Sequence, residues 1–225
     1  IYVHDEDHRM LYPFNCCLFL AEILLKTGFR VNGVDYVEPK TISRALSELG
    51  DIFLSASAAQ YGGFTISRIE NLISYFCKKT FEKLYPEKLK NKIDFMKDFL
   101  GRDLTEEEIS NVETFIKKEV EDIILNDIKQ GYQGLEYKLN TVASSRGDYP
   151  FTTITLGNTL YGDYWAEKAC EIILEVRKNG QGVKGKKKPV AFPKIIFLYD
   201  ETLHGEGMPY EALFDKAIDC SCVTM

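Results

Sequence analysis

Two adjacent cysteines near the start of the chain are the residues best suited to do chemistry. Cys16 and Cys17 follow Asn15 at the head of an apolar run. A thiol there can act as a hydrogen-atom donor, an electron donor or a nucleophile, and a nucleophile would need a nearby base. The alternative is that both thiols pack as small apolar side chains. Adjacent cysteines rarely bond to each other, because the ring is strained, so the pair predicts reduced thiols.

Histidines and aspartates precede the cysteines at His4, Asp5, Asp7 and His8. Imidazole and carboxylate groups both bind divalent ions. His4 and His8 would share a face only within a helix, whereas residues 1–4 have the pattern of a short strand. We therefore predict no metal site here and expect His4 and Asp5 to form hydrogen bonds at the end of a strand.

A polar turn from Asn140 to Asp148 offers hydroxyls, free amides and a guanidinium. Ser144, Ser145 and Arg146 could hold phosphate or ribose oxygens, and an ordinary turn is the alternative. Residues 180–185 match the spacing GxGxxG. That motif holds a pyrophosphate only between a strand and a following helix, and here a helical pattern precedes it, so we expect a loop.

Composition limits the classes of function. The 225 residues are 45% hydrophobic, enough to bury a sizeable core, and the net charge of -6 disfavours binding to a nucleic-acid backbone. No signal peptide and no membrane-length apolar run are visible. The six irregularly spaced cysteines indicate reduced thiols in a cytoplasmic protein. The chain starts without methionine, within a predicted strand, so we expect a fragment of a longer protein.

Helices must position these residues. Apolar residues recur at three- and four-residue steps in residues 41–59, 66–79 and 164–178, which predicts three amphipathic helices. Thr105 to Glu108 have the pattern of a capping box that opens a further long helix. The charged residues 80–104 between them predict a surface excursion.

Strand patterns alternate with the helical ones. Residues 151–156 and 190–199 are rich in β-branched and apolar side chains, and we expect the second strand to be buried. Residues 15–25 predict an apolar segment deep in the fold. The alternation of strands and helices favours an α/β chain whose sheet is covered by helices.

Several blocks spread over nearly the whole chain match one known family in order. They are Tyr2 to Asp5 with Asn15 to Leu18, then Gln60 to Phe64, Gln130 to Tyr137, Ser144 to Thr153 and Phe192 to Lys194. Together they resemble the start of the catalytic barrel of the anaerobic (class III) ribonucleoside-triphosphate reductases.

This resemblance implies the first part of a ten-stranded α/β barrel of the glycyl-radical enzyme and ribonucleotide reductase type. Residues 1–225 would be a partial catalytic barrel domain. The ATP-binding regulatory region, the thiyl-loop cysteine and the glycyl-radical domain would lie outside it. The implied activity is the reduction of ribonucleoside triphosphates to deoxyribonucleoside triphosphates by glycyl and thiyl radical chemistry.

The resemblance also implies cofactors and partners. No cofactor is expected in this segment, whereas the parent enzyme would carry a glycyl radical installed by an S-adenosylmethionine and iron–sulfur activase. Formate would be the reductant, and ATP and deoxynucleotides would be effectors. A homodimer through residues 41–59 and 66–79 is expected in the full-length protein, with no DNA and no membrane as partners.

By the same resemblance, Cys16 matches the early barrel cysteine that supplies reducing equivalents. Cys17 is the one-residue alternative, because neighbouring side chains on an extended segment face opposite sides. The implied substrate-binding residues are Asn15, Gln60, Ser144, Ser145 and Arg146.

Two other readings of the sequence stay open. One is a different glycyl-radical enzyme that acts on a small acid. The other is a non-catalytic helical interaction module built from residues 41–130, in which the thiols are inert.

Overall fold

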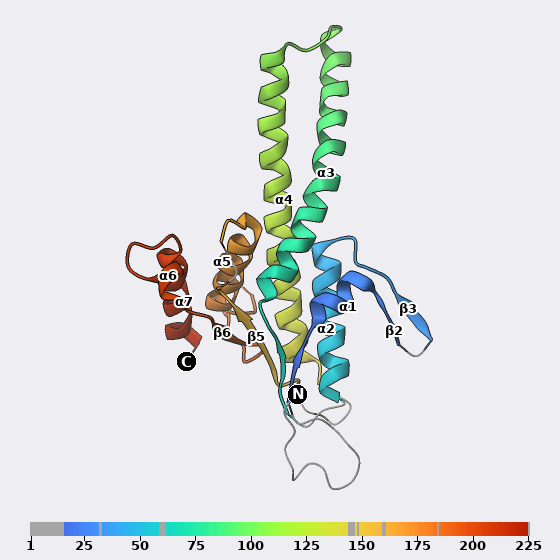
Figure 1. Cartoon of the computed structure of the whole chain (residues 1–225). Helices are drawn as coiled ribbons and strands as arrows, with labels where there is room; N and C mark the ends of the chain where they lie inside the picture. The colour runs from blue at the N-terminus through green and yellow to red at the C-terminus, as the bar shows by residue number, and fades with distance from the viewer. Residues whose placement is uncertain are drawn as a thin grey trace.

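The computed structural model describes residues 16–31, 33–58, 62–143, 147, 149–158, 161–183 and 185–224. Strands and helices alternate along these residues (Figure 1). In chain order they are β1 (Cys17–Phe19), α1 (Ala21–Thr27), β2 (Phe29–Val31), β3 (Val34–Tyr36), α2 (Ile42–Ala58), β4 (Phe64–Ile66), α3 (Ile69–Leu100), α4 (Glu106–Thr141), β5 (Thr152–Leu156), α5 (Tyr164–Asn179), β6 (Lys194–Phe197), α6 (Glu201–His204) and α7 (Glu211–Thr224).

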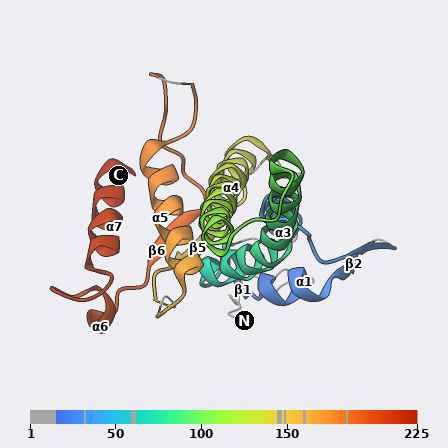
Figure 2. The same cartoon turned by 90° about the horizontal axis from the view of Figure 1, so that it is seen from above.

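The main sheet is parallel and has the strand order β1-β4-β5-β6. The spatial order of these four strands is the same as their order in the sequence, so the chain crosses the sheet in a single direction. Parallel crossovers are almost always right-handed, which puts the connecting helices on one face. The predicted α/β class with a helix-covered sheet is confirmed. Strands β2 and β3 form a separate antiparallel hairpin that extends away from the body beyond α1 (Figure 2).

The core lies between the sheet and the helices. Phe64, Ile66, Ile154 and Leu156 are buried on the helix-covered face. Phe53 of α2 meets the ring of Phe64 edge-on, with 5.2 Å between the ring centroids. The helices therefore hold the strands by side-chain packing on one face only.

Helices α3 and α4 form a long hairpin that projects beyond the sheet (Figure 1). Its turn contains the predicted capping box: Glu108 N–H donates to Thr105 Oγ1 (3.3 Å), and Thr105 N–H donates to Glu108 Oε2 (2.8 Å). The excursion expected for residues 80–104 is confirmed. It is helical through Leu100, although Pro86 lies within α3.

Three predictions about the bounds or the burial of segments differ from the structure. Ile66 belongs to strand β4 rather than to a helix over 66–79, and α3 begins at Ile69. Strand β6 covers only Lys194–Phe197 and is half-exposed, because among the described strands it pairs only with β5. The segment predicted to lie deep in the fold is only partly buried: among its described residues Ala21 and Leu25 belong to the core, whereas Leu18, Leu20 and Ile23 are 61%, 62% and 56% exposed.

The loop after α5 agrees with the sequence. Gly180 ends the helix with a φ of 64°, a conformation that glycine adopts at little cost. Gln181 and Lys188 then form an isolated antiparallel bridge before β6. The glycines of residues 180–185 thus follow a helix and precede a strand, which is the reverse of a dinucleotide-binding turn. No helix within the described part of the chain is long and apolar enough to cross a membrane.

Candidate active site

The structure describes Cys16 and Cys17. The remaining predicted site residues lie outside the described residues, namely Asn15, Gln60, Ser144, Ser145 and Arg146. Each belongs to a segment that leads into β1, β4 or β5. Parallel strands begin at the same edge of a sheet. The described strands that follow these segments therefore begin at one edge of the sheet, which we call the amino-terminal rim.

The described part of the amino-terminal rim consists of Cys16, Gly63, Phe151, Phe192 and Lys194. Cys17 N–H donates to the Gly63 carbonyl (3.1 Å), and Gly63 N–H donates to Cys16 Sγ (3.4 Å). The Phe151 and Phe192 rings lie edge-on at 5.6 Å, and Lys194 Nζ stands 4.4 Å from the Phe151 centroid. A continuous chain of contacts thus joins the starts of β1, β4, β5 and β6.

The two cysteines have different surroundings. Cys16 is exposed, whereas Cys17 is half-buried and packs against the helix-side core. Cys17 is in register with Phe64, which is fully buried on the helix-covered face. Side chains alternate along an extended segment, so the Cys16 thiol lies on the opposite face of the sheet.

We call that opposite side the open face. Along each strand the side chains of the open face alternate with those of the helix-side core. Beyond the rim, the open-face residues are Leu18, Thr65, Thr153, Thr155, Lys194 and Ile196. Leu18 and Ile196 are 61% and 48% exposed. A barrel interior that is only a packed core uses bulky branched apolar residues. The Thr155 hydroxyl is bound within the fold, by Arg68 N–H (2.9 Å) and Ser67 Oγ (3.2 Å). Thr65, Thr153 and Lys194 instead suit a face that meets a polar ligand.

Asn140, at the end of α4, fixes the segment that enters β6. Its Oδ1 accepts hydrogen bonds from Ala191 N–H (3.0 Å) and Phe192 N–H (3.1 Å). Its Nδ2 donates to the Phe192 carbonyl (2.6 Å) and to the Glu136 carbonyl (2.7 Å). One side chain therefore holds the backbone beside Lys194 in place.

A buried ion pair supports the same segment. Arg177 Nε donates to Glu136 Oε1 (2.7 Å), with side-chain exposures of 6% and 0%. Arg177 also donates to the Pro193 carbonyl, and Gln181 Nε2 donates to Glu136 Oε2 (3.0 Å). Removing one member of a buried pair leaves the other charge without compensation. The pair therefore ties α4 and α5 to the entry of β6.

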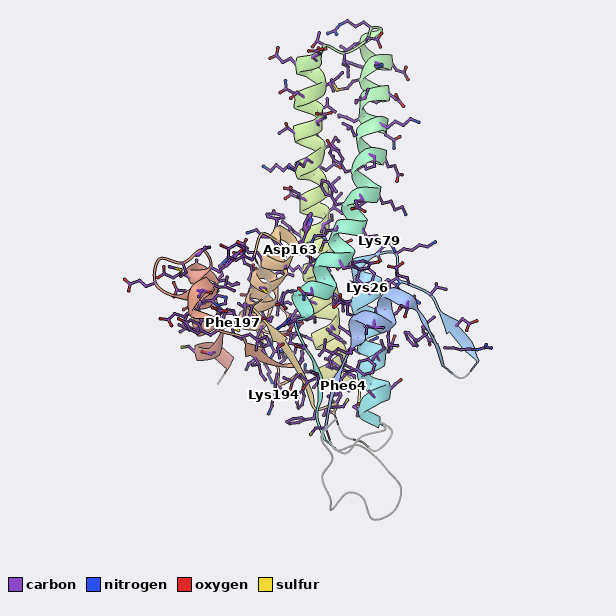
Figure 3. All side chains as sticks on the ribbon, viewed as in Figure 1. Lys26, Phe64, Lys79, Asp163, Lys194 and Phe197 are labelled. Carbon is purple, nitrogen blue, oxygen red and sulfur yellow. The ribbon has the colours of Figure 1, made fainter. Side chains whose placement is uncertain are left out.

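The carboxyl-terminal end of the sheet is occupied by structural contacts. Asp163 caps α5 by accepting from Ala166 N–H (3.2 Å), and it also accepts from Ser74 (2.8 Å) and Lys78 (2.6 Å). Burial raises the pKa of Asp163, but the hydrogen bonds from Lys78 and Ser74 outweigh it and the net pKa is lowered. In Figure 3 Asp163 lies above Phe197, whereas Lys194 and Phe64 lie lower, toward the opposite end of the sheet.

Of the other described thiols, Cys222 is exposed near the end of α7, whereas Cys77, Cys170 and Cys220 are buried. Burial raises the pKa of Cys77, Cys170 and Cys220, so these thiols stay protonated and poorly nucleophilic. Among the described residues no group of three or more His, Cys, Asp or Glu side chains could hold a metal ion. His4, Asp5, Asp7 and His8 lie outside the described residues.

Sequence reasoning missed Lys194 and Asn140 as residues of the candidate site. Lys194 breaks the apolar pattern in the middle of the predicted strand 190–199, which was the available signal. The role of Asn140 depends on contacts with residues 51 and 52 positions further along the chain. No local pattern reveals such contacts.

Comparison with known proteins shows which family the sequence matches. The sequence model of the family described as "Anaerobic ribonucleoside-triphosphate reductase" matches residues 1–225. Proteins of that name from Enterobacteria phage T4 and Haemophilus influenzae are 28% and 30% identical to the whole chain. The chain spans 34% and 29% of their lengths, about a third of these relatives.

A solved structure is similar at lower identity. It is the anaerobic ribonucleotide reductase from Thermotoga maritima in complex with dATP and CTP, with a TM-score of 0.47 and 17% identity over 80% of this chain and 28% of that one. The family match covers every residue of the chain. The chain belongs to the anaerobic ribonucleoside-triphosphate reductase family.

Proposed function

We propose that this chain is part of the catalytic subunit of an enzyme that reduces ribonucleoside triphosphates to deoxyribonucleoside triphosphates by glycyl and thiyl radical chemistry. The observation that carries the proposal is the family match over residues 1–225. An exposed thiol on the open face, at the rim where the predicted site segments enter the sheet, supports it. The activity belongs to the complete protein, of which the chain is about a third.

Cys16 is proposed as the thiol that delivers reducing equivalents to the ribose. A donor thiol must face the sugar in a site from which water is excluded. The exposure of Cys16 on the open face supports this role, and the packing of Cys17 against the helix-side core makes it the weaker alternative. The 2′ hydroxyl of the substrate leaves as water, and formate oxidised to carbon dioxide supplies the two electrons.

The radical itself comes from outside this segment. Family membership implies a glycyl radical that a separate activase installs with S-adenosylmethionine and an iron–sulfur cluster. We propose no cofactor within residues 1–225. The residues of this chain would bind the nucleotide, orient the ribose toward Cys16 and exclude water.

We propose that residues 1–225 form part of a barrel domain whose remaining strands continue from β1 and β6. ATP and deoxynucleotide effectors, a homodimer of the full-length protein and a cytoplasmic location belong to the same proposal. The family match disfavours a glycyl-radical enzyme for a small acid and an inert helical module.

Arg146 is proposed to bind substrate together with Asn15, Gln60, Ser144 and Ser145. If it contacts the nucleotide, Arg146→Ala in the full-length enzyme should raise the KM for the triphosphate about ten-fold or more. A charge-assisted hydrogen bond contributes roughly 1.5 to 3 kcal/mol. An unchanged KM would reduce Arg146 to a structural role.

The proposed function is tested with the full-length protein under anaerobic conditions. After activation by its activase, it should convert a ribonucleoside triphosphate to the deoxynucleotide, measured by chromatography of the products. Omitting formate should stop turnover. A radical-bearing protein that forms no deoxynucleotide from any of the four triphosphates would contradict the proposal.

A further inference from the structure

Lys194 is a candidate binding residue on the open face. Its register partner is Thr153 on β5, which pairs in turn with Thr65 on β4 and so continues the row to Leu18 on β1. These residues share the open face with Cys16. Among the described residues, Lys194 is the only cation in that row.

The ammonium of Lys194 has an aromatic neighbour instead of a carboxylate. Nζ stands 4.4 Å from the centroid of the Phe151 ring, and no carboxylate of the described residues forms an ion pair with it. Phe151 is 47% exposed. The ring and the aliphatic stem of the lysine place the charge, while its hydrogen-bonding capacity toward an anion stays available.

Hydrogen bonds from α4 and α5 hold the backbone that leads into Lys194. Asn140 binds the backbone of Ala191 and Phe192, and Arg177 donates to the carbonyl of Pro193. Three hydrogen bonds between the Asn140 side chain and residues 191 and 192, together with the buried pair of Arg177 and Glu136, thus fix the chain directly before Lys194. Such support is what a precise binding position requires.

Gly63 leaves room for the Phe151 ring at the rim. A Cβ at Gly63 would meet Phe151 Cδ1 at 3.0 Å, so the missing side chain lets the ring lie against β4. Cys16 and Phe151 belong to the starts of β1 and β5, which are two strand spacings apart, roughly 10 Å. That separation exceeds a direct contact and lies within the length of a nucleotide.

We propose that Lys194 binds the phosphates of the ribonucleoside triphosphate while the ribose lies at Cys16. This inference rests on the proposed function. The chain carries a net charge of -6, so a polyanionic substrate needs a local positive charge to approach the site. Lysine binds phosphate as a point charge, and the neighbouring threonine hydroxyls can donate to the remaining oxygens.

The test uses the full-length enzyme and its Michaelis constant for the triphosphate. Lys194→Met keeps the aliphatic stem on Phe151 and removes the charge. It should raise the KM for the triphosphate about ten-fold or more, with a smaller change in kcat. Lys194→Arg keeps the charge and should recover most of the affinity.

Lys187→Gln is the matched control, because Lys187 is exposed in the loop before β6. Its KM should stay within about two-fold of the wild type. An unchanged KM in Lys194→Met, or an equal rise in Lys194→Arg and Lys194→Met, would overturn the role of the charge. If the wild-type enzyme formed no deoxynucleotide at all, the proposed function would fail together with this inference, whereas a fully active Lys194→Met would overturn this inference alone.

Discussion

The adjacent residues Cys16 and Cys17 at the rim lie on opposite faces of the sheet. Cys16 is exposed and accepts a hydrogen bond from Gly63, whereas Cys17 lies against the helix-side core. The alternation of side chains along the strand causes this difference. A displacement of one residue in register would exchange their surroundings, so the assignment of Cys16 is a statement about register.

The buried side chain of His204 makes the free energy of unfolding depend on pH. His204 is 2% exposed among Phe197, Tyr199 and Phe214, and its Nδ1 accepts from Asp200 N–H (3.0 Å). Burial lowers the pKa of His204, while backbone hydrogen bonds to Gly157 and Asp200 oppose the shift. The unfolded chain then binds a proton more readily, so stability is lost as the pH falls below about 6.5.

His204→Gln should remove this contribution in the full-length protein. Urea unfolding at about pH 7.5 and about pH 5.5 measures it, because the two values bracket the unfolded pKa. The wild type should lose more stability between the two conditions than the variant does. Equal losses would mean that His204 does not protonate differently on unfolding.

Residue types alone suggest two candidate parts of the site, of which the turn at Ser144 to Arg146 lies outside the described residues. The thiol of Cys16 and the polar turn at Ser144 to Arg146 are recognisable because few side chains do radical, nucleophilic or anion-binding chemistry. Lys194 and Asn140 were not recognisable, because their roles come from pairing between β5 and β6 and from bonds to a distant segment. Register and long-range contacts are properties of the fold.

At the scale of elements, the hairpin of α3 and α4 depends on its turn. Thr105 and Glu108 satisfy each other's backbone amides, and Arg102 pairs with Glu108 (2.7 Å). The hydrogen bond from Arg102, then that from Thr105, lowers the pKa of Glu108 to about 2. The capping box therefore persists at all pH values near neutrality.

Thr105→Ala should weaken the start of α4. Loss of a capping side chain costs about 1 kcal/mol, roughly a five-fold increase in local opening. Hydrogen exchange of the first turn of α4, followed by mass spectrometry, measures this. Thr114→Ala is the control, since Thr114 is exposed within the helix and alanine is the better helix former. Equal protection in Thr105→Ala and the wild type would show that the cap is dispensable.

Long periodic elements were predictable, and elements without a strong period were not. The helices at Ile42–Ala58 and Tyr164–Asn179 match their apolar stripes, and β5 matches its β-branched run. The distal part of α3 has a weak stripe because it packs mainly against one partner helix. The hairpin of β2 and β3 has only three residues in each strand, too few to show an alternation.

At the scale of the whole molecule, the sheet has open edges. Among the described strands, β1 and β6 each pair with a single neighbour, and the open face exposes Leu18 and Ile196. Unpaired edges and exposed apolar side chains favour association. Residues 1–225 expressed alone should therefore aggregate or form a compact state without fixed tertiary packing. A sharp cooperative melt with native near-UV dichroism would contradict the proposal that they are part of a barrel.

The α/β class was predictable at this scale because strands and helices alternate. The layer order was not, since nothing in the local pattern says that β5 lies between β4 and β6. The exposure of Leu18 is likewise a property of the fold: apolar composition indicates burial, and only the layer arrangement shows that Leu18 lies on the face without helices.

The central claim is that Cys16 supplies reducing equivalents to the ribose. In the full-length enzyme, Cys16→Ser should keep the activase-dependent radical signal in electron paramagnetic resonance and abolish deoxynucleotide formation. Serine preserves volume, but its O–H bond is too strong to donate the hydrogen atom. Cys17→Ser, the matched control on the helix side, should retain most activity. An inactive Cys17→Ser beside an active Cys16→Ser would move the role by one residue, and full activity in both variants would contradict the account.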